Sequence, residues 1–210
     1  MGVPPRPVRV DPWGTLHAVA ARGATFGNRG VLHDRDREIV RGWQGRRWII
    51  CRTDFRGRAR EVLPDGGYTG LFFRDEATAL AAGHRPCCEC RRADARAFLE
   101  AAGCAGDTAA LDGALHRERL VGDARPRDGL RASRRIHPPS ATAAVEGAVA
   151  ISRDGTTAVF SDGVWRQWAF GALGGAVEAG TLVGLLTPPT AMAALRAGYR
   201  PTDVPLIAHP

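Results

Sequence analysis

Short apolar segments alternate with helix-like segments in the first half of the chain. Residues 47–51 (RWIIC) and 71–73 (LFF) are bulky and favour β-structure. Asp75 suits the N-cap of a following helix, and Gly83 suits its left-handed end. Helices are predicted over residues 76–82, 87–103 and 111–121.

The second half has the pattern of a small β-structure. Its apolar segments are separated by Asp154-Gly155 and Asp162-Gly163, dipeptides that favour tight hairpins. The expected strands cover residues 147–152, 157–160, 164–170 and 181–186, and a final helix is expected over residues 191–197. These segments predict a small antiparallel sheet or barrel.

The two patterns together predict an α+β protein. The proline-rich start, with little amphipathic pattern, is expected to be an arm. A stretch rich in Pro, Gly and Arg is expected to be a basic linker between two folded parts. The predicted divisions are an arm over 1–24, an α+β module over 25–125, a linker over 126–140 and a small β-rich domain with a terminal helix over 141–210.

Composition narrows the class of protein. The 210 residues are 44% hydrophobic, which excludes disorder, collagen and coiled coil. All 29 basic residues are arginine and the acidic residues number 22, so the formal net charge is +7. The absence of lysine beside abundant Ala, Gly and Arg is typical of GC-rich coding, so the charge permits a polyanionic partner without requiring one. Neither a signal sequence nor a long apolar run is present, so we expect a cytoplasmic protein with no membrane partner.

The cysteines indicate metal chemistry. There are five, an odd number, and no secretory signal accompanies them, which argues against a disulfide framework. Cys87 and Cys90 form a CxxC pair, whose thiolates can both reach one tetrahedral ion. A thioredoxin-like redox pair would follow a strand in a βαβ unit, whereas here a predicted helix end and a proline come first. The motif therefore predicts zinc.

The surroundings of this motif resemble a known family. Cys51 at a strand end, a basic loop, an aromatic strand, an Ala-rich helix and the segment AGHRPCCECRRAD resemble the amino-terminal zinc domain of the Ada family of DNA-repair methyltransferases. The resemblance covers residues 47–94, under a quarter of the chain. It implies that Cys51, Cys87 and Cys90 bind zinc, and that Cys51 is the catalytic thiolate that accepts a methyl group from a methylated DNA phosphate.

One position departs from the family pattern. Phe55 stands where the family has its second cysteine, four residues after the first. A closed zinc site needs four ligands, and His33 is our first choice because it precedes the Cys51 strand by a plausible hairpin distance. The alternatives are Asp54, His84, His116 and His137. A neutral histidine in place of a thiolate would make the site less anionic and Cys51 a weaker nucleophile.

Arginines flank Cys51 and are interleaved with Trp43, Trp48 and Phe55. Guanidinium groups and aromatic faces suit a phosphate backbone and exposed bases, so we expect a nucleic acid, DNA in particular, as partner. The alternative is a solvated face in an arginine-rich chain. The residues assigned to this binding are Arg46, Arg47, Arg52, Arg56 and Arg58.

Two other functions remain open at this point. Pro86-Cys-x-x-Cys90 and His116-x-Glu118 are similar to the motifs of zinc deaminases, in inverted order. In a simpler hydrolytic form, Glu118 would be the catalytic general base beside an open metal position. Alternatively the zinc is structural, and the C-terminal β domain binds a protein or ligand partner.

Overall fold

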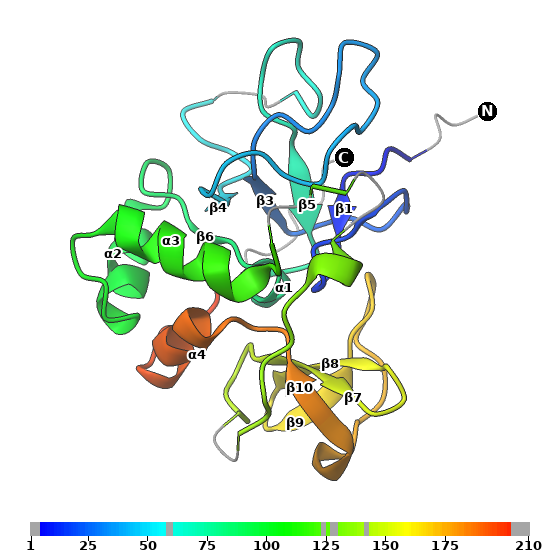
Figure 1. The fold of residues 1–210 in the computed structure, drawn as a ribbon, viewed down its shortest axis with the longest axis vertical. Coiled ribbons are helices and arrows are strands. Elements are labelled where there is room, and N and C mark those ends of the chain that lie inside the picture. Colours follow the sequence, from blue (N-terminus) through cyan, green and yellow to red (C-terminus); the bar gives the residue numbers. More distant parts are fainter. Residues whose placement is uncertain (1–4, 58–60, 123–124, 127–129, 141–142, 203–210) are drawn as a thin grey trace.

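The computed structural model describes residues 5–57, 61–122, 125–126, 130–140 and 143–202. It confirms the α+β class, with a six-stranded mixed sheet, a four-stranded antiparallel sheet and four α-helices in that part of the chain (Figure 1). The helices are α1 (Glu76–Ala81), α2 (Arg92–Ala101), α3 (Thr108–Arg119) and α4 (Pro189–Arg196). As predicted, the Asp75 side chain caps α1 by accepting a hydrogen bond from the Thr78 amide at 2.7 Å.

The six-stranded sheet has the order β2-β1-β5-β3-β4-β6. The pairs β1–β5 and β4–β6 are parallel, and the other neighbours are antiparallel. Its strands are β1 (Arg9–Val10), β2 (Leu16–His17), β3 (Thr25–Asn28), β4 (Ile49–Cys51), β5 (Leu71–Phe73) and β6 (Arg85–Pro86).

The two faces of this sheet differ because neighbouring residues of a strand point to opposite sides. Ile50, Leu71 and Phe73 are fully buried in the main core. The opposite face carries a row formed by Phe72, Phe26 and Cys51, which are paired directly across β5, β3 and β4. The cysteine of β4 therefore lies on the side of the sheet away from the main core.

The second sheet has the order β10-β7-β8-β9, with all pairs antiparallel, as predicted. Both expected hairpins form. Asp162 and Gly163 have φ values of 53° and 80° between β8 and β9, the pair of left-handed residues that a tight hairpin requires. The strands are β7 (Val149–Ser152), β8 (Thr157–Ser161), β9 (Val164–Gln167) and β10 (Leu182–Leu185).

The expected N-terminal arm is part of the fold. Strands β1 and β2 come from it, and Val10 is fully buried. Trp13 is also buried, and its Nε1 donates to Thr157 Oγ1 of the second sheet at 3.0 Å. The two strands of the arm were not predicted because they have two residues each, too short for any periodicity.

The two predicted folded parts share one core. The largest apolar cluster includes Ile50 and Leu80 from the first part and Ala150 and Met192 from the second. Helix α4, expected to belong to the β-rich domain, packs against α2 and α3. The expected linker lies partly outside the described residues. Within the described part, Arg134 is buried. Leu120 forms a β-bridge with Arg134, and His137 forms one with Leu185.

In the part of the chain that the structure describes, no helix has both the length and the apolar character to cross a membrane.

Candidate metal centre

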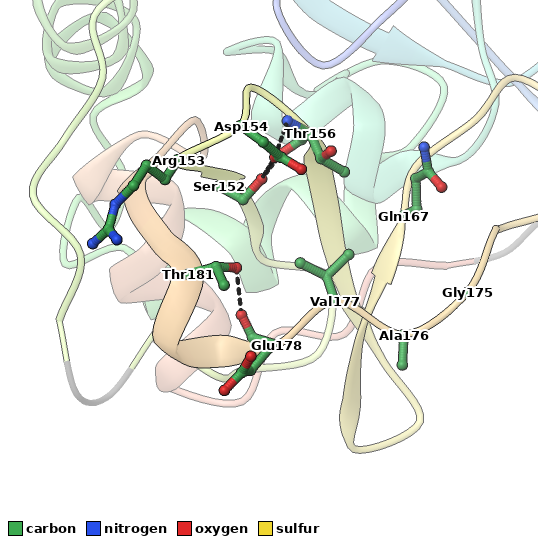
Figure 2. A pocket seen from close by; sticks show the side chains of 10 residues that line it. All are labelled: Ser152, Arg153, Asp154, Thr156, Gln167, Gly175, Ala176, Val177, Glu178 and Thr181. Atoms are coloured by element: carbon green, nitrogen blue, oxygen red, sulfur yellow. Dashed lines mark hydrogen bonds between the residues drawn. The ribbon is translucent and has the colours of Figure 1, made fainter.

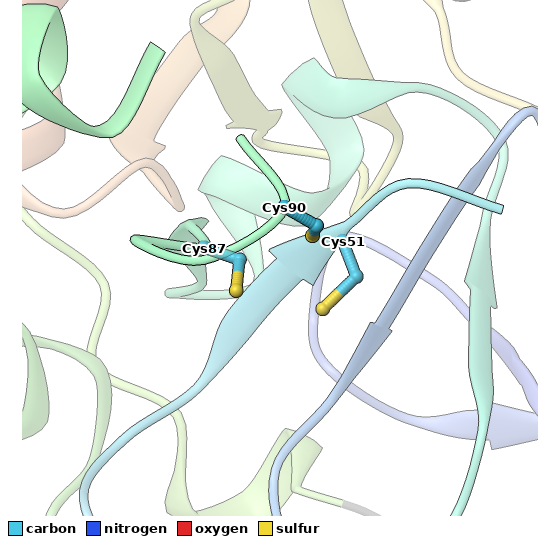
Figure 3. A group of neighbouring side chains, drawn as sticks. All are labelled: Cys51, Cys87 and Cys90. Carbon is cyan, nitrogen blue, oxygen red and sulfur yellow. The ribbon is translucent and has the colours of Figure 1, made fainter. Parts of the chain in front are cut away.

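Three cysteines distant in sequence meet beside the first sheet. The sulfur atoms of Cys51, Cys87 and Cys90 all lie within 4.8 Å of one another (Figure 3). The three residues are buried, with 5 to 8% of their surface exposed. Thiolates on one tetrahedral zinc ion have Zn–S distances of about 2.3 Å, which separates the sulfurs by about 3.8 Å. The three side chains are therefore close to the spacing that a shared ion needs.

Strand pairing places Cys87 beside Cys51. Ile50 pairs with Pro86 in the parallel ladder between β4 and β6, so the next residues, Cys51 and Cys87, are neighbours. The ladder bonds come from Arg85 and Cys87, whose amides donate to the carbonyls of Trp48 and Ile50. Pro86 lies between these two donors on an edge strand, where its missing N–H costs no ladder bond.

A tight turn returns Cys90 to the same place. The Arg91 amide donates to the Cys87 carbonyl at 3.0 Å, which closes the turn before α2. The Glu89 amide donates to Cys87 Sγ and the Arg52 amide to Cys90 Sγ, both at 3.4 Å. Cys88, in the middle of the turn, is exposed and outside the group.

Aromatic side chains form the wall of the centre. Phe26 and Phe72 pack edge to face with ring centroids 5.4 Å apart, and the half-buried Phe55 packs against the cysteine cluster. Phe55 thus brings a phenyl ring to the position where the resemblance implies a fourth thiolate. Among the described residues, no further His, Cys, Asp or Glu joins the group.

The three thiols strongly perturb each other. Contact with Cys87 and Cys90 raises the pKa of the Cys51 thiol far above its ordinary value, with burial acting in the same direction. Contact with Cys51 lowers the pKa of Cys87. Charge therefore concentrates on one sulfur, because several thiolates this close repel one another. A bound cation would allow all three to ionise. The donor set fits zinc, since soft thiolate ligands are those that zinc accepts in proteins.

His33 is not brought to the cysteines. Its Nδ1 lies 2.6 Å from Thr69 Oγ1, and its Nε2 lies 3.1 Å from the Pro64 carbonyl oxygen. Both ring nitrogens are therefore engaged by the segment between β4 and β5. β3 and β4 pair antiparallel, with Cys51 opposite Phe26, and the connection that contains His33 leaves the ladder after Asn28, at the end away from Cys51. His33 forms a β-bridge with Ile39 in that connection.

The other proposed ligands are also outside the group. Asp54 is exposed. His84 is fully buried against Trp48 and Phe73, with ring centroids at 5.1 and 4.7 Å. Strand alternation places it on the face of the sheet opposite the cysteines. The remaining two histidines, His116 and His137, belong to α3 and to the bridge with β10.

Glu118 has a structural role in this fold. Its two carboxylate oxygens accept hydrogen bonds from the amide and the hydroxyl of Thr190 at 2.9 and 2.7 Å. These bonds satisfy the first turn of α4, whose N-cap, Pro188, supplies no side-chain cap. A catalytic base would have to lie beside the metal, and the structure does not place Glu118 in the cysteine group.

The arginines assigned to nucleic acid are exposed where they are described. Arg46 and Arg47 precede β4, and Arg52 and Arg56 follow it. The Arg56 guanidinium lies 5.0 Å from the centroid of the Phe55 ring, which links this arginine to the wall of the metal centre. Arg58 lies outside the described residues.

A pocket that the sequence did not indicate lies on the second sheet (Figure 2). It has a volume of about 530 Å³ and lies beside β7, β9 and the segment before β10. Its polar side chains are Ser152, Arg153, Asp154, Thr156, Gln167, Glu178 and Thr181. Asp154 already accepts from the Thr156 amide and Ser152, so its carboxylate stabilises the β7–β8 turn.

No protein-family model, curated protein or solved structure matches this chain. The geometry of the three cysteines is thus the principal evidence about function.

Proposed function

We propose that this protein is a zinc–thiolate protein that binds nucleic acid, with Cys51 as an acceptor of methyl groups from methylated phosphates. The convergence of the Cys51, Cys87 and Cys90 sulfurs is the observation that supports it. These residues would hold the ion through three thiolates, and the metal would keep the sulfurs deprotonated at neutral pH.

Hydrogen bonding distinguishes Cys51 from the other two cysteines. Backbone amides donate to the sulfurs of Cys87 and Cys90, whereas no backbone amide in the described part of the chain donates to the Cys51 sulfur. An N–H bond withdraws charge from a thiolate and weakens it as a nucleophile. Cys51 therefore keeps the most reactive sulfur of the three.

Methyl transfer to Cys51 is balanced without a further reactant. The thiolate attacks the methyl carbon of a phosphotriester, an S–C bond forms, and the C–O bond to the phosphate breaks. The electron pair stays on the phosphate oxygen, which leaves as an ordinary phosphodiester. Because Cys51 is 5% exposed and Phe55 packs against the cysteine cluster, we infer that the Phe55 side chain moves aside when a phosphate approaches.

The exposed arginines support the nucleic-acid part of the proposal. Arg46, Arg47, Arg52 and Arg56 border β4 at its two ends, and none of them has a carboxylate partner among the described ion pairs. Unpaired guanidinium groups beside a strand end can bind phosphates by release of counterions. DNA affinity should then fall steeply as salt rises.

Metal analysis tests the centre itself. We expect one zinc ion per chain in the wild type and its loss in Cys87→Ser. Cys88→Ser is the matched control, because Cys88 belongs to the same motif but is exposed and outside the group. Equal metal content in Cys87→Ser and Cys88→Ser would refute the site.

Intact-protein mass spectrometry after incubation with methylated DNA tests the transfer. The expected product is the protein plus one methyl group, absent in Cys51→Ser and present in Cys104→Ser. Cys104 is a free, half-buried cysteine outside the group. A zinc-loaded protein that never gains a methyl group would contradict the acceptor role.

The burial of all three sulfurs favours a second candidate, a purely structural zinc in a nucleic-acid-binding protein. It predicts zinc content and salt-dependent DNA binding without methylation. The mass measurement separates the two.

A further inference from the structure

Three arginines with no ion-pair partner are buried on the core face of the first sheet. Arg29 and Arg119 are fully buried, and Arg134 is 6% exposed. None of the three lies within ion-pair distance of a carboxylate in the described part of the chain. A buried charge is costly unless a counter-charge is near it. These three residues therefore differ from the other buried arginines, Arg85 and Arg91, which pair with Asp112 and Glu76.

The guanidinium groups of Arg29 and Arg119 lie over the Trp48 ring, and the charge of Arg134 acts on both of them and on His84. Arg29, Trp48 and His84 lie one step beyond the paired residues of β3, β4 and β6, so they form a row across the sheet. The guanidinium carbons of Arg29 and Arg119 lie 4.9 and 3.8 Å from the centroid of the Trp48 ring. Arg134 joins them by donating from Nη1 to the Arg119 carbonyl at 2.7 Å.

Backbone carbonyls satisfy only part of the donors of this cluster. Arg29 donates to Gly14 and Arg119 to Gly83 and Arg46, while Arg134 also bonds the carbonyls of Ala81 and Leu186. Within this cluster, Arg29 Nε and Nη1, Arg119 Nε and Arg134 Nε are buried and have no hydrogen-bond partner among the described residues. A guanidinium nitrogen can only donate, so these positions need an acceptor. The two ring nitrogens of His84 make no well-formed hydrogen bond, and the backbone of Ala79 is the group that acts on the ring.

The electrostatics of the cluster agree with this geometry. Burial lowers the pKa of Arg29 to about 9 and that of Arg134 to about 10, and the Asp11 carboxylate acts in the opposite direction on both, so both remain charged at neutral pH. Burial and the charge of Arg134 lower the pKa of Arg119 well below its ordinary value, and Asp112 acts against that shift. Burial, together with the charges of all three arginines, lowers the pKa of His84 well below its ordinary value. His84 is therefore neutral and adds no positive charge. It can still donate through one ring nitrogen.

We propose that Arg29, Arg119, Arg134 and His84 form a closed binding site for one small inorganic anion, such as chloride or phosphate. The carboxylates that act on these arginines are Asp11 and Asp112, and Asp112 is already paired with Arg85. An anion would offset the remaining positive charge and accept from several unpaired donors at once. Water would satisfy donors but would add no counter-charge. This site is on the opposite face of β4 from the cysteines, and it is independent of metal binding.

Unfolding measurements at constant ionic strength test the site. The salt in the buffer is a bulky organic sulfonate, which is replaced in steps by chloride or inorganic phosphate. The protein is refolded in each buffer, because an anion cannot enter a closed site in the folded protein. We expect the wild-type midpoint of unfolding to rise with the logarithm of anion concentration above a threshold, as linkage requires. The rise should be lost or much reduced in His84→Phe, which keeps a ring between Trp48 and Phe73, and in Arg134→Met. Arg96→Met, an exposed arginine on α2, should behave as the wild type.

Crystals of the wild type grown with bromide test the site directly, and this test does not depend on whether a variant folds. An anomalous peak within hydrogen-bond distance of the three guanidinium groups is expected. Stability independent of the anion, with ordered water alone in the cluster, would overturn the proposal.

Discussion

Phe55 determines how many sulfurs the metal centre can offer. It is half-buried and packs against the cysteine cluster, at the position where the Ada-like pattern has a thiolate. A phenyl ring excludes water from the centre and cannot bind the ion. The centre therefore has three thiolates among the described residues, and a fourth donor must come from outside this set.

We therefore expect Phe55→Cys to add a fourth sulfur ligand. The variant should bind zinc at least about tenfold more tightly, since the conversion of an open site to a closed one adds a metal–sulfur bond. Competition with a chelator measures this affinity, and cobalt substitution reports the number of thiolates through its sulfur-to-metal absorption. Phe55→Leu is the control, because it removes the ring without adding a ligand. If Phe55→Cys and Phe55→Leu bind zinc equally, the side chain of residue 55 does not reach the ion.

The sequence predicted which cysteines form the group, but it did not predict the structural contacts of Glu118 and of the buried arginines. Cys87 and Cys90 have a local spacing that identifies a knuckle, and the family resemblance added Cys51. The contact between Glu118 and Thr190 could not be predicted, because the two residues are 72 positions apart and no local pattern links them. The buried arginines could not be predicted, because no local sequence pattern distinguishes Arg29 and Arg134 from the other arginines of a chain with 29 basic residues.

Among the elements, those with strong local signals were the predictable ones. The Asp-Gly hairpins, the Asp75 cap and the strand that ends in Cys51 all depend on residues adjacent in sequence. Strands β1, β2 and β6 have two residues each and are formed by pairing with distant segments. Their existence depends on the assembled sheet, so no window of sequence could show them.

The β8–β9 turn offers a test of such a local signal. Gly163 has a φ of 80° and no heavy atom within 4 Å of the place where a Cβ would stand. Gly163→Ala should therefore lower the free energy of unfolding by about 1 kcal/mol, from backbone conformation alone. Gly171 has equally open space and no left-handed φ, so Gly171→Ala should have almost no effect. Chemical denaturation of the two variants checks this, and equal effects would mean that conformation is not the cause.

At the scale of the molecule, one buried carboxylate ties the start of α1 to two distant segments. Glu76 is fully buried, and it accepts hydrogen bonds from Arg91 before α2 and from the Tyr199 hydroxyl after α4. The amide and hydroxyl of Thr202 complete the set, both at 2.7 Å. These bonds hold the described C-terminal end of the chain against the knuckle that carries Cys87 and Cys90.

We expect Glu76→Gln to destabilise the whole molecule by about 3 kcal/mol, because it leaves the buried Arg91 charge without its main partner. It also places an amide N–H₂ donor against neighbours that are themselves donors. Glu61→Gln is the matched control. Glu61 pairs with Arg37 on the surface, where both side chains are more than 40% exposed, so its loss should cost less than about 0.5 kcal/mol. Denaturant unfolding gives both values, and zinc content reports the knuckle. Because Arg91 follows Cys90 directly, we expect Glu76→Gln to release zinc faster to a chelator than Glu61→Gln does. Equal release rates beside unequal stabilities would show that the metal centre is held by β4 and β6 alone.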